Sequence, residues 1–330
     1  MSSPAPIVTI FGGSGFVGRY VARRLAKAGW RIRVAVRRPN EALFVRTYGV
    51  VGQIEPVQAN IRDEASTRRA IEGATAVVNC VGILGEFGKQ TFDAVQDEGA
   101  GRIARLAAEA GVSRLVHVSA IGADANSPSL YARSKAAGEA AATAAFPGAV
   151  ILRPSIIFGP DDHFFNRFGR MARLSPILPL VGAGTRFQPV YVDDVAAAAA
   201  AAVEGDVAPG VYELGGPETA TFRELMTTLL GVIQRRRALV ALPKTVAELQ
   251  AGALDFAQRW SFGLFANELL TRDQVILLGR DNVVAEGARG FEALGLTPTP
   301  MEAILTGYLY VYRPGGQYAA IKESATQLRA

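Results

Sequence analysis

Three glycines spaced three residues apart mark the point where a strand-like run near the N-terminus becomes a helix-like run. The stretch from Ile7 to Leu25 reads IVTIFGGSGFVGRYVARRL, with Gly12, Gly15 and Gly18 at the transition. A glycine inside a helix costs about 1 kcal/mol relative to alanine, so three at a regular spacing indicate a specific requirement. A strand, a glycine turn and a helix in this order predict the first unit of a parallel α/β sheet, with an anion bound at the helix N-terminus.

The glycine turn predicts a dinucleotide site. Gly12 would let the backbone approach a pyrophosphate, and the helix that begins near Gly15 would point its free N–H groups at that anion. Gly18 would let the helix pack tightly on the first strand. The alternative is a glycine-rich hairpin that binds nothing. The expected contacts from this region are Gly12, Ser14, Gly15, Phe16, Val17 and Gly18.

The first half of the chain alternates short β-branched runs with longer alanine-rich runs. Such alternation implies a parallel sheet covered on both faces by right-handed crossovers. The runs that indicate strands are Ile7–Phe11, Arg31–Val36, Ile54–Gln58, Ala76–Asn79, Leu115–Ser119 and Val150–Leu152. The runs that indicate helices are Gly15–Ala28, Glu41–Tyr48, Asp63–Ile71, with Asp63 as N-cap, Thr91–Ala110 and Tyr131–Ala145. The fold class is therefore α/β, a Rossmann-type doubly wound parallel sheet.

The regular alternation stops after residue 154, where the chain becomes rich in glycine and proline. Asp193 or Asp194 is placed to cap an alanine-rich helix, and Gly210–Gly216 predicts one more strand. Thr271–Gln274, TRDQ, has the spacing of a capping box. We therefore expect two lobes. A dinucleotide-binding domain would comprise residues 1–160 and about 187–215, and a smaller, mostly helical lobe about 161–186 and 216–330.

Composition limits the remaining classes of function. Cys80 is the single cysteine, which excludes internal disulfides, and His117 and His163 lie far apart without ligand spacing, so no metal site is expected. No apolar run approaches the roughly 20 residues that span a bilayer. The N-terminus MSSPAPIV lacks the pattern of a secretory signal. The chain is therefore expected in the cytoplasm or on a cytoplasmic membrane surface.

The net charge is +5, and the densest basic run is QRRRALVALPK around Arg235–Arg237. This run is either a solvated face or a contact for phosphate groups, acidic lipid or an acidic partner. Aromatic residues do not interleave with it, so nucleic acid is not expected as a partner. The following segment, PKTVAELQAGALDFAQRW, reads as a helix that lies against a partner or a membrane surface, or packs within the smaller lobe.

Two arginines at the end of the second strand favour a phosphorylated cofactor. In NAD sites an acidic residue at this position binds the ribose hydroxyls, whereas VAVRRPN offers Arg37 and Arg38. A guanidinium binds a 2′-phosphate through paired hydrogen bonds, so NADP(H) is expected rather than NAD(H). The alternative is that both arginines are solvated loop residues. The other expected cofactor contacts follow the third, fourth and sixth strands: Asn60, Ile61, Val81, Gly82, Pro154 and Ile156.

A serine, a tyrosine and a lysine follow the fifth strand. Ser119 ends that strand, and YARSK places Tyr131 and Lys135 one helical turn apart on one face. A tyrosine with a pKa of about 10 is a poor acid or base at neutral pH, and a neighbouring ammonium stabilises its phenolate. A serine hydroxyl can steady a substrate carbonyl. The alternative is an ordinary surface pair on an amphipathic helix.

These residues together resemble the short-chain dehydrogenase/reductase superfamily, in its extended or atypical branch, over roughly residues 5 to 215. The resemblance implies that Tyr131 is the acid/base, that Lys135 also binds the nicotinamide ribose and that Ser119 orients the substrate. All three would also contact the cofactor.

A narrower resemblance comes from the second half of the chain. The stretches RPSIIFGPDDHFFNRF, QPVYVDDVAAA, TRDQVILLGRDNVV and LGLTPTPMEAI together are similar to the nucleotide-binding accessory subunit of respiratory complex I, the alpha subcomplex subunit nine family. This resemblance implies NADPH held as part of the structure, with complex I peripheral-arm subunits as partners near the quinone-binding arm and the membrane surface. A chain that runs almost directly into its first strand fits a bacterial member on the cytoplasmic face of the inner membrane.

Two kinds of function remain open. The first is an accessory subunit that holds NADPH without turnover, in which Ser119, Tyr131 and Lys135 are vestigial as a catalytic set. The second is a free NAD(P)H-dependent reductase, epimerase or dehydratase acting on a small molecule. A redox sensor that signals to a partner is a third reading. Phe158, Phe164 and Phe165 would either plug the substrate space above the nicotinamide, which fits the first function, or shape that space.

Overall fold

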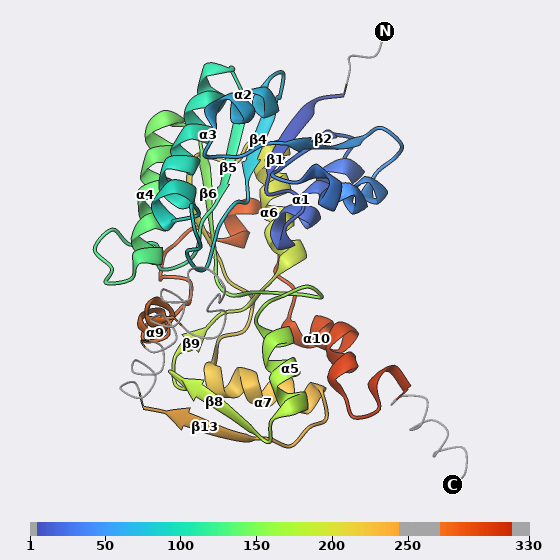
Figure 1. Cartoon of the computed structure of the whole chain (residues 1–330), viewed down its shortest axis with the longest axis vertical. Coiled ribbons are helices and arrows are strands. Elements are labelled where there is room, and N and C mark those ends of the chain that lie inside the picture. The colour runs from blue at the N-terminus through green and yellow to red at the C-terminus, as the bar shows by residue number, and fades with distance from the viewer. Residues whose placement is uncertain (1–4, 244–251, 253–270, 319–330) are drawn as a thin grey trace.

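The computed structural model describes residues 5–243, 252 and 271–318, in two lobes that lie one above the other in Figure 1. The upper lobe contains a seven-stranded sheet in the order β11-β6-β5-β4-β1-β2-β3, with every neighbouring pair parallel. Its strands are β1 (Ile7–Phe11), β2 (Arg31–Val36), β3 (Ile54–Gln58), β4 (Ala76–Asn79), β5 (Arg114–Val118), β6 (Val150–Pro154) and β11 (Gly210–Leu214). The predicted doubly wound α/β class is confirmed.

Helices cover both faces of this sheet. On one face, α1 (Phe16–Lys27) and α6 (Val192–Glu204) share an aliphatic core with the strands. On the other face lie α2 (Glu64–Ile71), α3 (Glu98–Glu109) and α4 (Leu130–Ala145). Successive residues of a strand face opposite sides, so Val77 of β4 lies in the core under α3 and α4 while Val78 lies under α1 and α6.

Local signals set several helix boundaries as expected. Asp63 caps α2 by accepting a hydrogen bond from the Ser66 N–H at 2.8 Å. Two predicted helices have other geometries: Pro39–Tyr48 forms the 3₁₀ helix η1, and Asp93–Asp97 forms the π-helical turn η2 before α3.

The expected cap of α6 is wrong. Tyr191 is the N-cap residue, and no side chain caps that helix. Asp193 instead forms two hydrogen bonds with the Arg24 guanidinium of α1, and Asp194 accepts from the backbone and hydroxyl of Thr299. Both carboxylates therefore join elements that are distant in sequence instead of capping their own helix.

The lower lobe is built from short strand pairs and helices around an aromatic core. The pairs are β7 (Ile157–Phe158) with β10 (Val190–Tyr191), β9 (Arg186–Phe187) with β12 (Ala220–Thr221), and β8 (Ile177–Val181) with β13 (Ala238–Leu242). The helices are α5 (Phe165–Leu174), α7 (Phe222–Val232), α9 (Arg272–Leu277) and α10 (Met301–Leu309). Two 3₁₀ turns follow α10, η4 (Tyr310–Tyr312) and η5 (Gly316–Tyr318), whereas a third, η3 (Phe291–Leu294), packs on the sheet lobe. The predicted capping box at Thr271 and Gln274 begins α9.

The C-terminal third of the chain touches both lobes. Tyr308 of α10 donates a 2.6 Å hydrogen bond to the buried Asp162 carboxylate in the lower lobe. Phe291, by contrast, packs in the sheet core with α1 and α6, although it falls in the segment expected to belong wholly to the smaller lobe. In the part of the chain that the structure describes, no helix has the length and apolar character needed to cross a membrane.

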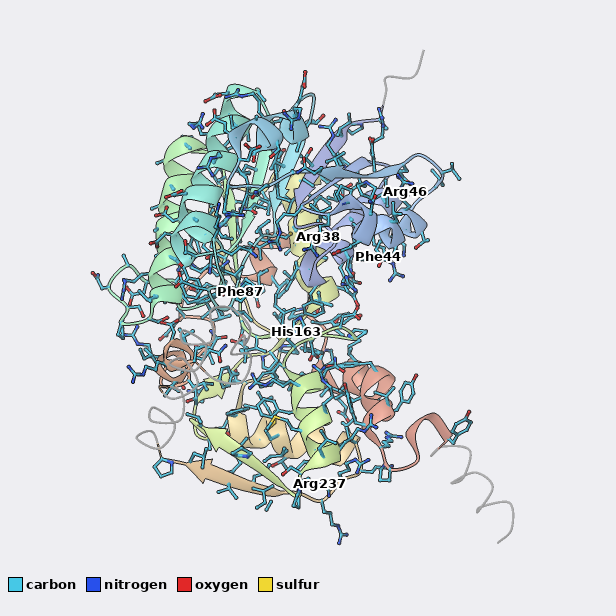
Figure 2. The ribbon with its side chains drawn as sticks, in the orientation of Figure 1. Arg38, Phe44, Arg46, Phe87, His163 and Arg237 are labelled. Carbon is cyan, nitrogen blue, oxygen red and sulfur yellow. The ribbon has the colours of Figure 1, made fainter. Side chains whose placement is uncertain are left out.

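The basic run around Arg235 lies at the end of the lower lobe farthest from the sheet, where Figure 2 labels Arg237. Arg235 donates to the Tyr312 carbonyl and Arg237 to the Ala172 carbonyl, so both guanidinium groups bond within the chain. The helix expected after this run lies almost entirely outside the described residues.

Candidate functional site

The glycine turn between β1 and α1 has the geometry of a close backbone approach. Gly12 has a φ of +72°, which side-chain-bearing residues rarely adopt, and its carbonyl accepts from the Gly15 N–H at 2.9 Å. A Cβ on Gly18 would overlap the Gly12 carbonyl oxygen and lie 2.7 Å from Gly13 Cα. Gly18 is therefore required for packing the helix onto the turn.

The start of α1 is open. No side chain caps Gly15, the first turn holds no acidic residue, and a Cβ on Gly15 would meet only the Gly12 carbonyl oxygen, at 3.1 Å. Ser14, Phe16 and Val17 lie half-buried around this start. The unsatisfied N–H groups and the positive end of the helix dipole suit a phosphate group.

Arg37 and Arg38 are exposed after β2, and Arg38 lies at the end of the sheet lobe nearer the lower lobe (Figure 2). Arg38 pairs with Glu41 at 3.0 Å, with about three quarters of its side chain exposed. An exposed pair of this kind contributes about 0–1 kcal/mol, so a phosphate can displace Glu41.

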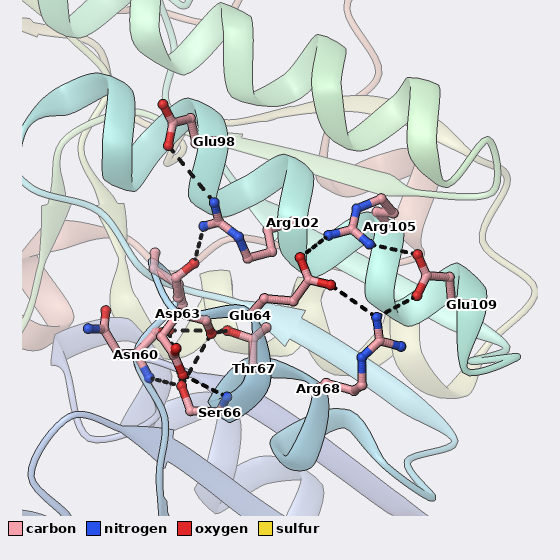
Figure 3. Close-up of polar contacts among 11 residues, drawn as sticks. Asn60, Asp63, Glu64, Ser66, Thr67, Arg68, Glu98, Arg102, Arg105 and Glu109 are labelled. Atoms are coloured by element: carbon pink, nitrogen blue, oxygen red, sulfur yellow. Dashed lines mark hydrogen bonds and ion pairs between the residues drawn. The ribbon is translucent and has the colours of Figure 1, made fainter.

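The turn after β3 is fixed by its own hydrogen bonds (Figure 3). The Asn60 carbonyl accepts from the hydroxyls of Ser66 and Thr67, and its side-chain oxygen accepts from the Arg62 N–H. Ile61 is buried, and its carbonyl accepts from Arg102 of α3. Asn60 and Ile61 thus lie in a rigid turn at the carboxyl edge of the sheet.

A buried amide–imidazole pair holds the chain after β4. The Asn79 side-chain oxygen accepts from the Val81 N–H, and its amide nitrogen donates to His117 Nδ1, both at 3.0 Å. Burial, followed by the Lys135 charge, lowers the pKa of His117 to about 3, so the imidazole is neutral. The Asn79 bond thus holds Val81, and with it the exposed Gly82. Val81 lies beside the glycine turn, since a Cβ on Gly12 would be 3.2 Å from its side chain.

Lys135 brings the third set of predicted residues to the same edge. Its ammonium donates to the Val118 carbonyl, at 3.2 Å, at the end of β5, and lies 3.3 Å from the position of a Cβ on Gly82. Only 5% of the residue is exposed, and this burial lowers the pKa of Lys135 to about 8. Ser119, next along from Val118, has a buried hydroxyl with no hydrogen-bond partner among the described residues.

Tyr131 lies one turn before Lys135 on α4. Its ring packs edge-to-face on Phe92 at 6.0 Å between centroids. Burial and, second, the Asp273 carboxylate raise the pKa of Tyr131 to about 12. The Ser-Tyr-Lys residues thus lie near the carboxyl ends of β4 and β5, together with the glycine turn.

The comparison with protein families decides the relationship. Residues 8–215, which include the turn and the Ser-Tyr-Lys residues, match the model described as "NAD dependent epimerase/dehydratase family". The chain belongs to that family.

Curated relatives extend the similarity through the lower lobe. NADH dehydrogenase (ubiquinone) 1 alpha subcomplex subunit 9, mitochondrial, of Arabidopsis thaliana is 35% identical, covering 94% of this chain and 79% of the relative. Ceramide reductase of Caulobacter vibrioides is 35% identical over 81% of this chain and 85% of its own. The resemblance to the subunit nine family is thus confirmed. The chain is also similar to a protein named as a reductase, at the same identity.

Solved structures agree on the fold. An NADPH-dependent quinone oxidoreductase from Escherichia coli, complexed with NADPH, superposes with a TM-score of 0.69 and 18% identity, covering 92% of this chain and 98% of that one. At this identity the likeness concerns the architecture.

Of the two positions predicted near the sixth strand, Pro154 is the last residue of β6 and Ile156 follows it. The Pro154 carbonyl accepts from the Ile121 N–H, and the Ile156 carbonyl accepts from the Val190 N–H. These bonds join the carboxyl end of β6 and the residues after it to the loop that follows β5 and to β10. Phe158 and Phe165, however, are fully buried in the lower-lobe core, and Phe164 packs there against Phe168 and Phe222. These rings do not fill the space above the sheet edge, because they pack on one another.

Sequence reasoning missed three side chains that organise the site: Asn79, His117 and Asp273. His117 lies on β5 and Ser119 directly follows that strand, with its N–H still paired to β6, so the two side chains face the same side, and this spacing was the available signal for His117. Asp273 lies in the predicted capping box of α9, but its contact with α4 spans more than 140 residues. No local pattern predicts such a contact.

Proposed function

We propose that this chain is an NADPH-holding accessory subunit of respiratory complex I, with a structural role and little or no turnover. The observation that carries the proposal is the extent of the similarity: 35% identity to an alpha subcomplex subunit 9 over 94% of this chain, lower lobe included. Under the proposal its partners are peripheral-arm subunits near the quinone-binding arm, and its location is the cytoplasmic face of the inner membrane, where it also touches the membrane surface.

The residues at the sheet edge fit a dinucleotide. The uncapped start of α1 would take the pyrophosphate, and the open direction at Gly15 leaves room for it. Arg37 and Arg38 would bind a 2′-phosphate, Asn60 and Ile61 would flank the adenine, and Lys135 beside Gly82 would contact the nicotinamide ribose. The residues left to complete the site are Val81, Pro154 and Ile156. A bound nicotinamide would supply hydride chemistry.

The state of Tyr131 supports a holding role. An efficient general acid has a pKa near the working pH, whereas the pKa of Tyr131 is raised to about 12. The Lys135 ammonium donates its hydrogen bond to the Val118 carbonyl and is not among the charges that shift the pKa of Tyr131. Acid/base chemistry at Tyr131 is therefore poorly matched to neutral pH.

One observation favours a second candidate, a free NAD(P)H-dependent reductase. The Ser119 hydroxyl is buried and has no hydrogen-bond partner in the described residues, and buried polar groups are nearly always paired. A substrate carbonyl would satisfy it. The 35% identity to a protein named ceramide reductase supports the same candidate.

Turnover measurements separate the two functions. Purified protein would be mixed with NADPH and a panel of carbonyl compounds that includes quinones and long-chain ketones, and the Tyr131→Phe variant would be assayed in parallel. The proposal expects no oxidation above the rate without protein. Oxidation at ordinary enzyme rates, on the order of 1–10³ per second, that Tyr131→Phe abolishes would establish the reductase instead.

A further inference from the structure

Helix α4, which carries Tyr131 and Lys135, is capped by a carboxylate from a different part of the chain. Asp273 of α9 accepts from the Leu130 N–H at 2.6 Å, from the Tyr131 N–H at 3.2 Å and from the Ser129 hydroxyl at 2.7 Å. Ser129 in turn accepts from the Ala132 N–H at 3.2 Å. Figure 1 shows α9 beside the end of α4 that faces the lower lobe.

This arrangement completes the N-terminus of α4. A helix begins with N–H groups that have no partner within the helix. Ser129, the N-cap residue, satisfies one of them, and Asp273 satisfies the N–H groups of the first two helical residues. A carboxylate also interacts favourably with the positive end of the helix dipole. The start of α4 therefore depends on a residue that lies 142 positions beyond Tyr131.

Two neighbouring contacts tie the same segments together. Arg280 forms a 3.2 Å ion pair with Asp124, whose backbone N–H donates to the Ala132 carbonyl of α4. The Asn282 amide donates to the Ile121 carbonyl, in the loop that follows β5. Residues 273–282 thus span the loop between β5 and α4.

We propose that Asp273 is a positioning residue for the Tyr131–Lys135 helix: its carboxylate fixes the first turn of α4 to α9 and places a negative charge at the backbone of Tyr131. The inference rests on the proposed function and deepens it. It gives a physical reason why Tyr131 would be a poor acid or base although Ser119, Tyr131 and Lys135 are all present. Asp273 acts through Tyr131 and is not itself catalytic.

The charges around Tyr131 support this assignment. Among the residues that the structure describes, Asp273 is the charged group that raises the pKa of Tyr131, after the larger effect of burial. Lys135 follows one turn later on α4, and the Asp124–Arg280 pair lies across the loop, where its opposite charges largely offset one another. The ring that packs on Tyr131 belongs to the uncharged Phe92.

The test is a pH titration of Tyr131 in the whole protein by NMR with labelled tyrosine. The chain has nine tyrosines, and Tyr131→Phe identifies the signal that matters. Asp273→Asn keeps an acceptor oxygen but removes the charge. We expect on the order of tenfold more Tyr131 phenolate at a given alkaline pH than in the wild type. We also expect amide exchange at Leu130 and Tyr131 to be on the order of tenfold faster.

Asp281→Asn is the matched control. It removes one negative charge from the same segment, but its carboxylate accepts from the Arg186 N–H and none of its described contacts is with α4. It should leave the Tyr131 titration unchanged, and Asp273→Glu, which retains the charge, should lie close to the wild type. A merely structural role for Asp273 would change stability without changing the titration.

Either of two results would overturn the inference: Asp273→Asn titrating as the wild type, or Asp281→Asn producing an equal change. If Asp273→Asn does not fold, amide exchange in the wild type decides. Exchange at Leu130 and Tyr131 as slow as at Ala132, whose N–H is bonded to Ser129, supports the assignment, and exchange at the rate of an open helix start rejects it. The titration needs neither nucleotide nor complex I, so its failure is distinguishable from failure of the proposed function.

Discussion

Two helices begin at the carboxyl edge of the same parallel sheet, and their N-termini are treated in opposite ways. The start of α1 has no side-chain cap and no acidic residue in its first turn, so its N–H groups are open to an anion. The start of α4 is closed by Ser129 and by the Asp273 carboxylate. The free N–H groups at the start of α1 are thus available to a ligand, whereas those at the start of α4 are bonded within the protein.

The two helix starts also differ in how far apart in the sequence the residues that form them lie. The open helix is specified by seven residues, Gly12 to Gly18, whose packing is visible in their spacing. The closed helix requires a residue from another lobe. Changes at α1 should therefore act on nucleotide binding and local packing, whereas changes at α4 should act through burial and charge.

The largest effect on stability is expected from Gly18→Val, which disrupts the packing of α1 on the glycine turn. Any Cβ at this position overlaps the Gly12 carbonyl, and rigid backbone cannot move aside. Overpacking of this kind costs about 3 kcal/mol of unfolding free energy. Urea unfolding without nucleotide measures it, and an unchanged midpoint would show that Gly18 does not pack on the turn.

Gly15→Val is the matched variant in the same turn. Its backbone is extended, with a φ of −72°, and its Cβ meets one atom only, so the protein without nucleotide should keep most of its stability. Bound nucleotide should be lost, together with the stabilisation it supplies, about 2.7 kcal/mol at a hundredfold excess over Kd. Full nucleotide occupancy after purification would mean that Gly15 does not face the pyrophosphate.

The second largest effect concerns the nucleotide that the open helix receives. Replacing Arg37 and Arg38 with alanine should weaken NADPH binding by about 1.5–3 kcal/mol, through loss of charge-assisted contacts, and leave NADH binding nearly unchanged. Calorimetry with both nucleotides measures the difference. Equal affinity of the wild-type protein for NADPH and NADH would contradict the assignment of a 2′-phosphate site.

A pH-dependent effect should come from Lys135 on α4. Its folded pKa, about 8, lies below the ordinary 10.5, so the unfolded chain binds more protons between these values. The free energy of unfolding should therefore rise with pH across this window, by up to about 1.4 kcal/mol per pH unit, and the cost of burying the charge is fully present below pH 8. Denaturation curves of the wild type and Lys135→Met should differ in this slope. If the unfolding free energies of the two proteins changed with pH in parallel, Lys135 would not be a buried group with a lowered pKa.

The smallest effect is expected from Tyr131→Phe. The hydroxyl is lost, but the ring contact with Phe92 remains, as does the backbone bond to Asp273. Stability should change by about 0.5 kcal/mol or less, and assembly and nucleotide content should not change. Lys135→Ala is the contrasting variant, because it should weaken nucleotide retention. A large loss of assembly in Tyr131→Phe would assign the hydroxyl a role in the complex.

The sheet was predictable because its signals are local. β1, β2, β3 and β4 have the bounds that their β-branched runs indicate, and β5 is shifted by one residue. The strand β13 was not predicted, since ALVAL follows three arginines and pairs with β8, some sixty residues earlier, across a proline at position 179. Such pairing depends on the tertiary arrangement. Asp193 and Asp194 failed as caps for the same reason, because distant donors and cations compete with the nearby helix end.

The site was predictable to the same extent. Glycine spacing and the Tyr131–Lys135 turn lie within short windows, and the structure brings both to one sheet edge. The Asn79–His117 bridge joins neighbouring strands, and Asp273 joins two lobes. These contacts form only when the chain folds and brings distant residues together. No local sequence pattern marks them, so His117 and Asp273 were recognised only in the structure.

Purification of complex I from the membranes of the native cells, with this chain tagged at its own locus, tests the central claim most directly. The account predicts that the chain co-purifies with complex I, that NADPH is extracted from the preparation in amounts matching the chain, and that Gly15→Val removes the nucleotide. Recovery of the chain entirely outside complex I, with Tyr131-dependent oxidation of NADPH by a cellular carbonyl compound, would contradict it.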